Sequence, residues 1–224
     1  MNRRNEYRGL LRRRDCLVPT WRGLLLFALL VAGLVALTMS KIHPFLAVTE
    51  PVSANILVVE GWVPDYVLKE TKNEFERGHY RKLYVTGGPL ENGSALSEYK
   101  TYAELGTAIL NKMGISDSAL EAVPFPSVRQ DRTYTSALAL NNLLRQQGAS
   151  GTGIVLISLG AHSRRSRLLF QKALGDNSIV GIIAVEDRSY DPDHWWKFSA
   201  GVRAVVDELF AYTYAQVVFP FIEP

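Results

Sequence analysis

Residues 153–167, GIVLISLGAHSRRSR, contain the pattern that decides the fold. The apolar run over residues 153–159 has no polar alternation, which is typical of a strand buried on both faces of a parallel sheet. It passes through Gly160 and His162 into a polar segment that predicts a helix over residues 163–174. A histidine and three arginines at this junction indicate either a solvated helix surface or a site for an anionic ligand.

Short apolar runs alternate with amphipathic segments along the rest of the chain. The expected strands are residues 55–61, 82–88, 119–125, 153–159 and 178–185. The expected helices are residues 64–78, 95–113, 131–148, 163–174 and a closing helix over 193–218. Continuous apolar strands separated by helices predict an α/β fold of Rossmann-like type, with a doubly wound, mostly parallel sheet covered by helices on both faces.

A membrane anchor is predicted ahead of this domain. Residues 23–40, GLLLFALLVAGLVALTMS, are uncharged and long enough to cross a bilayer as one helix. A cleaved signal peptide is the alternative, but about twenty mostly polar residues come first and the end of the segment is a poor cleavage site. A buried core helix fits less well because the segment has no polar face. Residues 41–54, with two prolines, are expected to form a linker.

Charge predicts the orientation of the anchor. Residues 1–22 hold seven arginines against Glu6 and Asp15, a net charge of +5, so the rest of the chain carries −2 of the total +3. Basic flanks stay in the cytoplasm, so we expect a cytoplasmic tail (1–22) and an extracytoplasmic domain (55–224). That domain is slightly acidic, so no nucleic-acid partner is expected. It has no disulfide, because the single cysteine, Cys16, belongs to the tail.

Candidate site residues follow the expected strands, whose carboxyl ends meet at one edge of a parallel sheet. In chain order they are Glu60, Gly61, Gly87, Gly88, Glu98, Arg132, Thr133, His162 and Arg165. The glycines would offer backbone donors, the arginines would neutralise an anion, His162 would act as acid or base, and Glu98 would orient it or a water. Structural alternatives stay open for each type: a tight turn at the glycines, helix starts at Ser97–Glu98 and Thr133, and a structural histidine at 162.

Several familiar sites have no counterpart in this sequence. It contains no phosphate-binding P-loop, no dinucleotide fingerprint and no nucleophile elbow of the Gly-x-Ser-x-Gly type. The four histidines are too scattered for a zinc signature. ATPase, dehydrogenase, serine hydrolase and zinc enzyme classes are therefore disfavoured, and no metal or cofactor is assigned.

The ordered series VVEG, LYVTGGP, SEYKTYAE, RTYTSALAL, VLISLGAHSRRSRLLFQKA and VDELFAYTY resembles the SanA/YdcF/ElyC family of bacterial cell-envelope proteins over about residues 55–215. The resemblance implies a Rossmann-like domain behind one transmembrane helix in the bacterial inner membrane. It also implies a role in envelope integrity and in peptidoglycan or lipid-carrier metabolism. The family's Gly-Gly falls on Gly87 and Gly88, its Ser-Glu on Ser97 and Glu98, its Thr on Thr133, and its His and Arg on His162 and Arg165.

Two departures from the family pattern bear on the ligand. The first strand ends in Glu60-Gly61-Trp62 instead of a glycine cluster, and the Asn-Thr-x-Glu-Asn-Ala pattern reads RTYTSA over 132–137. A pocket that gains Arg132 and loses a glutamate should prefer a more anionic ligand. We therefore expect an envelope protein that binds or processes a phosphate-containing metabolite, as a hydrolase or transferase. The alternative is a non-catalytic envelope factor that acts through protein partners.

Overall fold

The computed structural model describes residues 6–7, 11–12, 20–93, 95–149 and 151–218, and it divides into two compact units, Met1–Met39 and Ser40–Pro224. Most of the predicted tail, including Cys16, lies outside the described residues. In the first unit, β1 (Glu6–Tyr7) pairs antiparallel with β2 (Leu11–Arg12).

Helix α1 (Trp21–Leu46) has 26 residues, and its most apolar window has a mean hydropathy of 2.4, enough to cross a membrane. It is longer than the predicted span of 23–40 at both ends. Its last residues include His43 and Leu46, which are buried in the second unit. The expected linker 41–54 is therefore helical as far as Leu46, and Glu50 is fixed to β7 by a bridge to Ile182.

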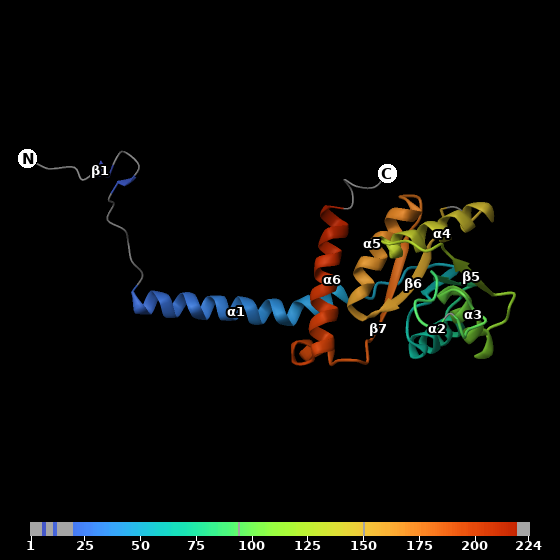
Figure 1. Ribbon diagram of the computed structural model, residues 1–224, viewed down its shortest axis with the longest axis horizontal. Helices are drawn as coiled ribbons and strands as arrows, with labels where there is room; N and C mark the ends of the chain where they lie inside the picture. Colours follow the sequence, from blue (N-terminus) through green and yellow to red (C-terminus); the bar gives the residue numbers. More distant parts are fainter. Residues whose placement is uncertain (1–5, 8–10, 13–19, 94, 150, 219–224) are drawn as a thin grey trace, which may run out of the picture. The chain divides into compact units, whose positions relative to one another are not determined.

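The second unit is built on a five-stranded parallel sheet, as the sequence predicted (Figure 1). Its strands are β3 (Ile56–Glu60), β4 (Lys82–Gly87), β5 (Leu120–Pro124), β6 (Ile154–Leu159) and β7 (Val180–Val185). Their order across the sheet is β5-β4-β3-β6-β7, so the chain reverses its direction of winding between β3 and β6. All five residues of β3 are buried, which explains why its sequence shows no alternation.

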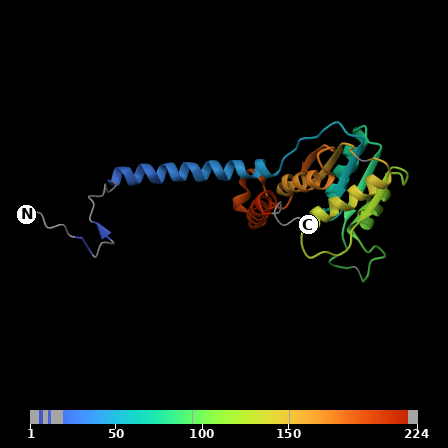
Figure 2. The same ribbon diagram turned by 90° about the horizontal axis from the view of Figure 1, so that it is seen from above.

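Helices cover both faces of this sheet. On one face α2 (Asp65–Arg77) and α3 (Tyr102–Lys112) bury Leu57, Val59 and Leu83. On the other face α4 (Arg132–Gln146) and α5 (Ser163–Leu174), which lie next to each other in Figure 2, bury Val58 and Leu156. The 3₁₀ turn η1 (Gly160–His162) leads from β6 into α5, and η2 (Pro192–Lys197) precedes α6 (Ser199–Val217), which packs against α5.

Two predicted helix boundaries were wrong. Helix α3 begins at Tyr102 instead of residue 95, because Thr101 and Glu104 form a capping box that fixes its first turn. Ser97 is not a cap, and its hydroxyl accepts a hydrogen bond from the Tyr99 amide in the preceding loop. The expected helix over 193–218 is divided at Phe198 into η2 and α6.

Candidate functional site

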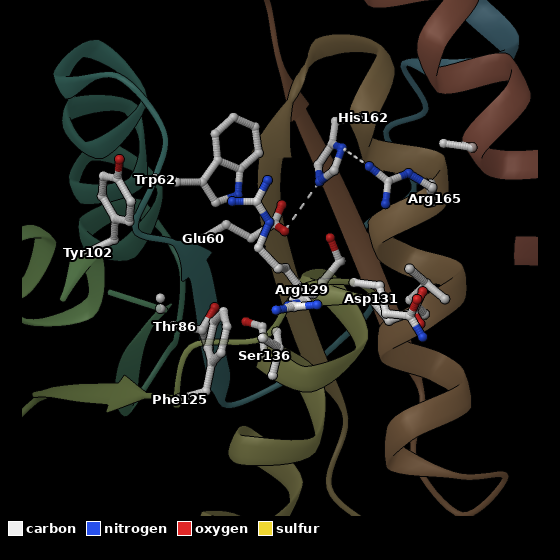
Figure 3. A pocket seen from close by; sticks show the side chains of 18 of the residues that line it. Glu60, Trp62, Thr86, Tyr102, Phe125, Arg129, Asp131, Ser136, His162 and Arg165 are labelled. Carbon is white, nitrogen blue, oxygen red and sulfur yellow. Dashed lines mark hydrogen bonds and ion pairs between the residues drawn. The ribbon is translucent and has the colours of Figure 1, made fainter. Parts of the chain in front are cut away.

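The candidate site lies where the direction of winding reverses, at the carboxyl ends of β3 and β6. Glu60 is the last residue of β3, and His162 ends the turn that follows the neighbouring strand β6. Such switch points are the usual ligand sites of open parallel sheets. In Figure 3 the two side chains point toward each other, with His162 Nε2 3.4 Å from Glu60 Oε1.

Glu60 is a buried carboxylate with only 2% of its surface exposed. Its Oε2 atom accepts hydrogen bonds from the hydroxyls of Ser158 and Ser166. Burial alone would raise the pKa of Glu60, but the charge of His162 and the hydrogen bonds from His162 and the serines lower it below its usual value. The carboxylate is therefore held ionised next to the imidazole.

The other ring nitrogen of His162 is held by α6. His162 Nδ1 lies 2.8 Å from Glu208 Oε1, and Arg165 donates to both oxygens of the same carboxylate, from Nε at 2.8 Å and Nη2 at 2.9 Å. His162 and Arg165 are one helical turn apart, so both side chains reach Glu208. Together Glu60, His162, Arg165 and Glu208 form the charge cluster of the site.

The charge cluster fixes the protonation of its members. Burial would lower the pKa of His162, but the charge of Glu60 and the hydrogen bonds to Glu208 and Glu60 raise it to about 9. Burial would raise the pKa of Glu208, but the hydrogen bonds from Arg165 and His162 lower it to about 2. At neutral pH the cluster therefore holds an imidazolium and a guanidinium against two carboxylates.

The charge cluster forms one wall of a cavity of about 770 Å³. The remaining walls come from the end of β4, the segment from Phe125 to Thr133, the start of α4 and the α6 residues Ala211, Tyr214 and Ala215. Trp62 also lines the cavity, and its ring meets the His162 ring edge-on, with centroids 5.0 Å apart and an interplanar angle of 88°. A cavity of this size suits a ligand much larger than a single phosphate ion.

Besides His162, the lining holds hydrogen-bond donors that have no partner among the described residues. The Thr86 hydroxyl is buried and has no hydrogen-bond partner among the described residues. The exposed Arg129 forms no ion pair or hydrogen bond within that part of the chain. At the start of α4, Asp131 makes no side-chain cap bond, and the amides of Arg132 and Thr133, which have no partner within the helix, adjoin the cavity. Asp131 also has a left-handed backbone, φ 56°, which is uncommon outside glycine.

The structure brings together seven of the nine residues that the sequence analysis proposed. The cavity lining includes Glu60, Gly87, Gly88, Arg132, Thr133, His162 and Arg165. Glu98 lies in an exposed loop outside the lining, and the role of orienting His162 falls to Glu60 and Glu208 instead. Gly61 also lies outside the lining.

The glycines have packing reasons of their own. A Cβ atom on Gly61 would lie 2.4 Å from the Tyr102 carbonyl oxygen, and one on Gly87 would lie 2.5 Å from the Ala103 amide nitrogen. A Cβ on Gly88 would lie 2.8 Å from the Phe125 ring. Close approach of α3 and of Phe125 therefore requires glycine at these positions without any ligand.

The expectation that Arg132 and Arg165 would neutralise an anionic ligand needs correction. Arg132 is exposed and forms an ion pair with Glu91 at the rim of the cavity. Arg165 is neutralised by Glu208, and His162 lies between two carboxylates. The lining charges are therefore largely balanced, and Arg129 is the guanidinium left available to a ligand. Thr133 is not the helix cap either, because the N-cap position belongs to Asp131.

Sequence reasoning missed Glu208 altogether. On α6 it occupies the same helix face as the buried residues Gly201, Val205 and Ala215. A carboxylate on the apolar face of a helix is rare unless it is paired, and this was the signal that could have identified it. Trp62 and Thr86 are adjacent to proposed glycines, and Arg129 is three residues before Arg132, but none of the three was proposed.

No group of three or more His, Cys, Asp or Glu side chains that could hold a metal ion occurs in the described part of the chain. No protein-family model, curated protein or solved structure matches this chain.

Proposed function

We propose that this chain is a membrane-anchored protein of the bacterial cell envelope that binds a phosphate-containing metabolite and hydrolyses or transfers its phosphate group. The observation that carries the proposal is the charge cluster of Glu60, His162, Arg165 and Glu208 in the wall of a ligand-sized cavity. Clustered titratable groups with strongly shifted pKa values in a cleft are typical of catalytic sites.

The unpartnered donors favour a phosphate group as the anchored part of the ligand. The Thr86 hydroxyl, the Arg129 guanidinium and the amides of Arg132 and Thr133 at the start of α4 all adjoin one cavity. A phosphate presents several acceptor oxygens and negative charge, which a helix N-terminus and an arginine both stabilise. The rest of the 770 Å³ would hold the organic part of the metabolite.

The raised pKa of His162 favours a role as general acid. With a pKa of about 9 the imidazole is protonated at neutral pH, and its Nε2 atom has no hydrogen-bond partner of good geometry. When the P–O bond of a bound ester breaks, the leaving oxygen would take the Nε2 proton. A water or an acceptor hydroxyl would replace that oxygen on phosphorus and return a proton to the imidazole. Glu60 and Glu208 would hold the ring in position throughout.

Helix α1 and its flanks support the proposed location. Helix α1 is apolar enough to cross a membrane, and seven arginines precede its apolar part. The positive-inside tendency then supports a cytoplasmic tail and a second unit outside the cytoplasm, in an inner-membrane protein. The resemblance to the SanA/YdcF/ElyC family supports the same location and a substrate from peptidoglycan or lipid-carrier metabolism.

The test uses the full chain in lipid nanodiscs. Phosphate release is measured from a panel of phosphate monoesters, sugar diphosphates and isoprenyl phosphates. We expect His162→Gln to abolish turnover. We expect Arg129→Gln to raise KM with little change in kcat, because Arg129 has no partner among the described residues and would contact only the ligand. Arg145→Gln, an exposed arginine on α4 outside the cavity, is the matched control.

Turnover that survives His162→Gln in a folded protein would contradict the catalytic assignment. Absence of both turnover and binding across the panel would contradict the phosphate ligand, and would favour the alternative of a non-catalytic envelope factor.

A further inference from the structure

The C-terminal half of helix α6, with the capping residue that follows it, presents an apolar outer face. Phe210 is 71% exposed, Val217 is 56% exposed, and Tyr214 and Val218 are each 40% exposed. These positions have spacings of four, seven and eight residues from Phe210, so they share one side of the helix. The opposite side of α6, with Gly201, Val205 and Ala215, is buried against the second unit. An exposed apolar stripe of this kind marks an interaction surface.

The same helix contacts the residues by which α1 enters the second unit. The rings of Phe45 and Tyr212 meet edge-on with centroids 5.6 Å apart. Arg164 lies over the Phe45 ring, 4.1 Å from its centroid, and its Nε atom donates to the Phe45 carbonyl oxygen. These contacts lie entirely within the unit that begins at Ser40. They attach α6 to the point where the chain leaves its apolar anchor.

Chain connectivity then limits how far α6 can lie from a bilayer. The uncharged part of the anchor ends at Ser40, and Lys41 follows it. Five residues of helix separate Ser40 from Phe45, which at 1.5 Å per residue is roughly 8 Å. With α1 in a bilayer, Phe45 would therefore lie within the headgroup region or next to it, and Tyr212 of α6, in contact with Phe45, would lie near the same level.

We propose that the outer face of α6, defined by Phe210, Tyr214, Val217 and Val218, docks on the lipid surface of the membrane that holds α1. This inference rests on the proposed anchoring by α1, and not on the proposed phosphate chemistry. The face has aromatic and aliphatic side chains, which is the composition of helices that lie in the interfacial plane. Exposed Trp196 and Phe198, just before α6, extend the aromatic character that is common at membrane interfaces.

Docking of α6 would also affect the cavity. Tyr214 belongs to the docking face and also lines the cavity, together with Ala211 and Ala215 of the same helix. Docking of α6 would therefore place one wall of the cavity at the lipid surface and orient the whole second unit relative to the membrane.

The experiment measures the environment of single labels on the full chain. In a Cys16→Ser background, Val217→Cys or Phe210→Cys is labelled with an environment-sensitive fluorophore and the protein is reconstituted at one copy per nanodisc. Lys112→Cys, exposed at the end of α3, is the matched control. Leu30→Cys, within the apolar part of α1, reports whether the anchor itself is inserted. Thermal unfolding of each labelled protein checks that it is folded.

We expect the labels at 210 and 217 to show a blue-shifted emission, quenching by nitroxide lipids, and protection from iodide in the aqueous phase. The label at 112 should show the reverse. Iodide quenching at 210 and 217, with the Leu30 label quenched by nitroxide lipids, would overturn the docking while leaving the anchor intact.

Protection from iodide without nitroxide quenching would mean that protein covers the face, and would also overturn the proposal. If the labels at 210 and 217 are protected from iodide only when several copies share a nanodisc, a second copy of the chain covers the outer face of α6 instead of lipid. If lipid nitroxides do not quench the Leu30 label, α1 is not inserted in the bilayer, and the docking that depends on this anchor is overturned as well. None of these outcomes depends on turnover, so failure of the docking and failure of the proposed function are separable.

Discussion

His162 Nδ1 lies 2.8 Å from Glu208 Oε1, although the two residues are 46 positions apart in the chain. This contact joins the turn after β6 to the last helix. Arg165 strengthens the connection by donating hydrogen bonds to both carboxylate oxygens of Glu208. The imidazole is therefore held from the side opposite Glu60, and its charge depends on a residue from a distant element.

Replacing Glu208 should lower the pKa of His162. Glu208→Gln keeps the shape of the side chain but removes a hydrogen bond and a negative charge that raise this pKa to about 9. It also leaves Arg165 without a charged partner, so we expect a loss of about 1–3 kcal/mol in the free energy of unfolding. The histidine pKa is measured by NMR titration. Asp207→Asn, at the exposed neighbouring position, is the control, and a His162 pKa that is equal in the two variants would refute the assignment.

Stability should fall as the pH rises above neutral. The folded-state pKa of His162, about 9, is above its ordinary value of 6.5, so its contribution is fully present below about pH 6.5 and is lost as the pH rises through 9. The complete loss corresponds to about 3 kcal/mol, by the conversion of a pKa shift into free energy. The pKa of Glu208 is shifted the other way, to about 2, so its contribution is lost as the pH falls from about 4.5 through 2.

Thermal unfolding of the full chain between pH 5 and pH 9.5 measures this dependence. His162→Gln should flatten the alkaline decline, whereas His79→Gln, at an exposed position after α2, should leave it unchanged. An alkaline decline of equal size in both variants would show that another group is responsible.

The sequence predicted the sheet well because burial on both faces leaves a local signal. β3 and β6 read as continuous apolar runs, and the polar residues after them identified the edge where Glu60 and His162 meet. Helix α5 was predicted with its observed bounds, Ser163–Leu174. Helix α3 was predicted too long, because the residues before Thr101 have helical spacing but the capping box starts the helix later.

The partners within the site were less predictable, because tertiary contacts decide them. Glu208 and Arg165 come together only when α6 packs on α5, and no local pattern records that packing. Arg132 was expected to face the ligand, but the loop that carries Glu91 brings a carboxylate to it. Glu98 was expected within the helix over residues 95–113 and was given a role at the site. Because α3 begins only at Tyr102, Glu98 lies in the exposed loop before the helix.

The unpartnered hydroxyl of Thr86 should cost stability and serve binding. Thr86 is 1% exposed, and its Oγ1 atom has no hydrogen-bond partner among the described residues. Thr86→Val keeps the shape and suits a strand, so the free energy of unfolding should rise by about 1 kcal/mol, at the low end of the cost of an unsatisfied buried group. Affinity for the phosphate ester identified by the turnover panel should fall, while Thr86→Ser should retain it. A Thr86→Val protein that is both less stable and equally able to bind would contradict this role.

Gly61 should be intolerant of a side chain although it lies outside the cavity. Its amide donates to the Thr86 carbonyl oxygen at 2.6 Å, and a Cβ atom would lie 2.4 Å from the Tyr102 carbonyl oxygen at the start of α3. Because both neighbours are backbone, Gly61→Ala must push β3 and α3 apart, at a cost of about 1–3 kcal/mol in the free energy of unfolding. Gly153→Ala, whose Cβ would have its nearest contact at 3.5 Å, is the matched control and should be near neutral. Chemical denaturation compares the two variants. Equal stabilities would mean that α3 can move away from β3 freely, and the wall of the cavity that contains Gly87 and Tyr102 would then be adjustable instead of fixed.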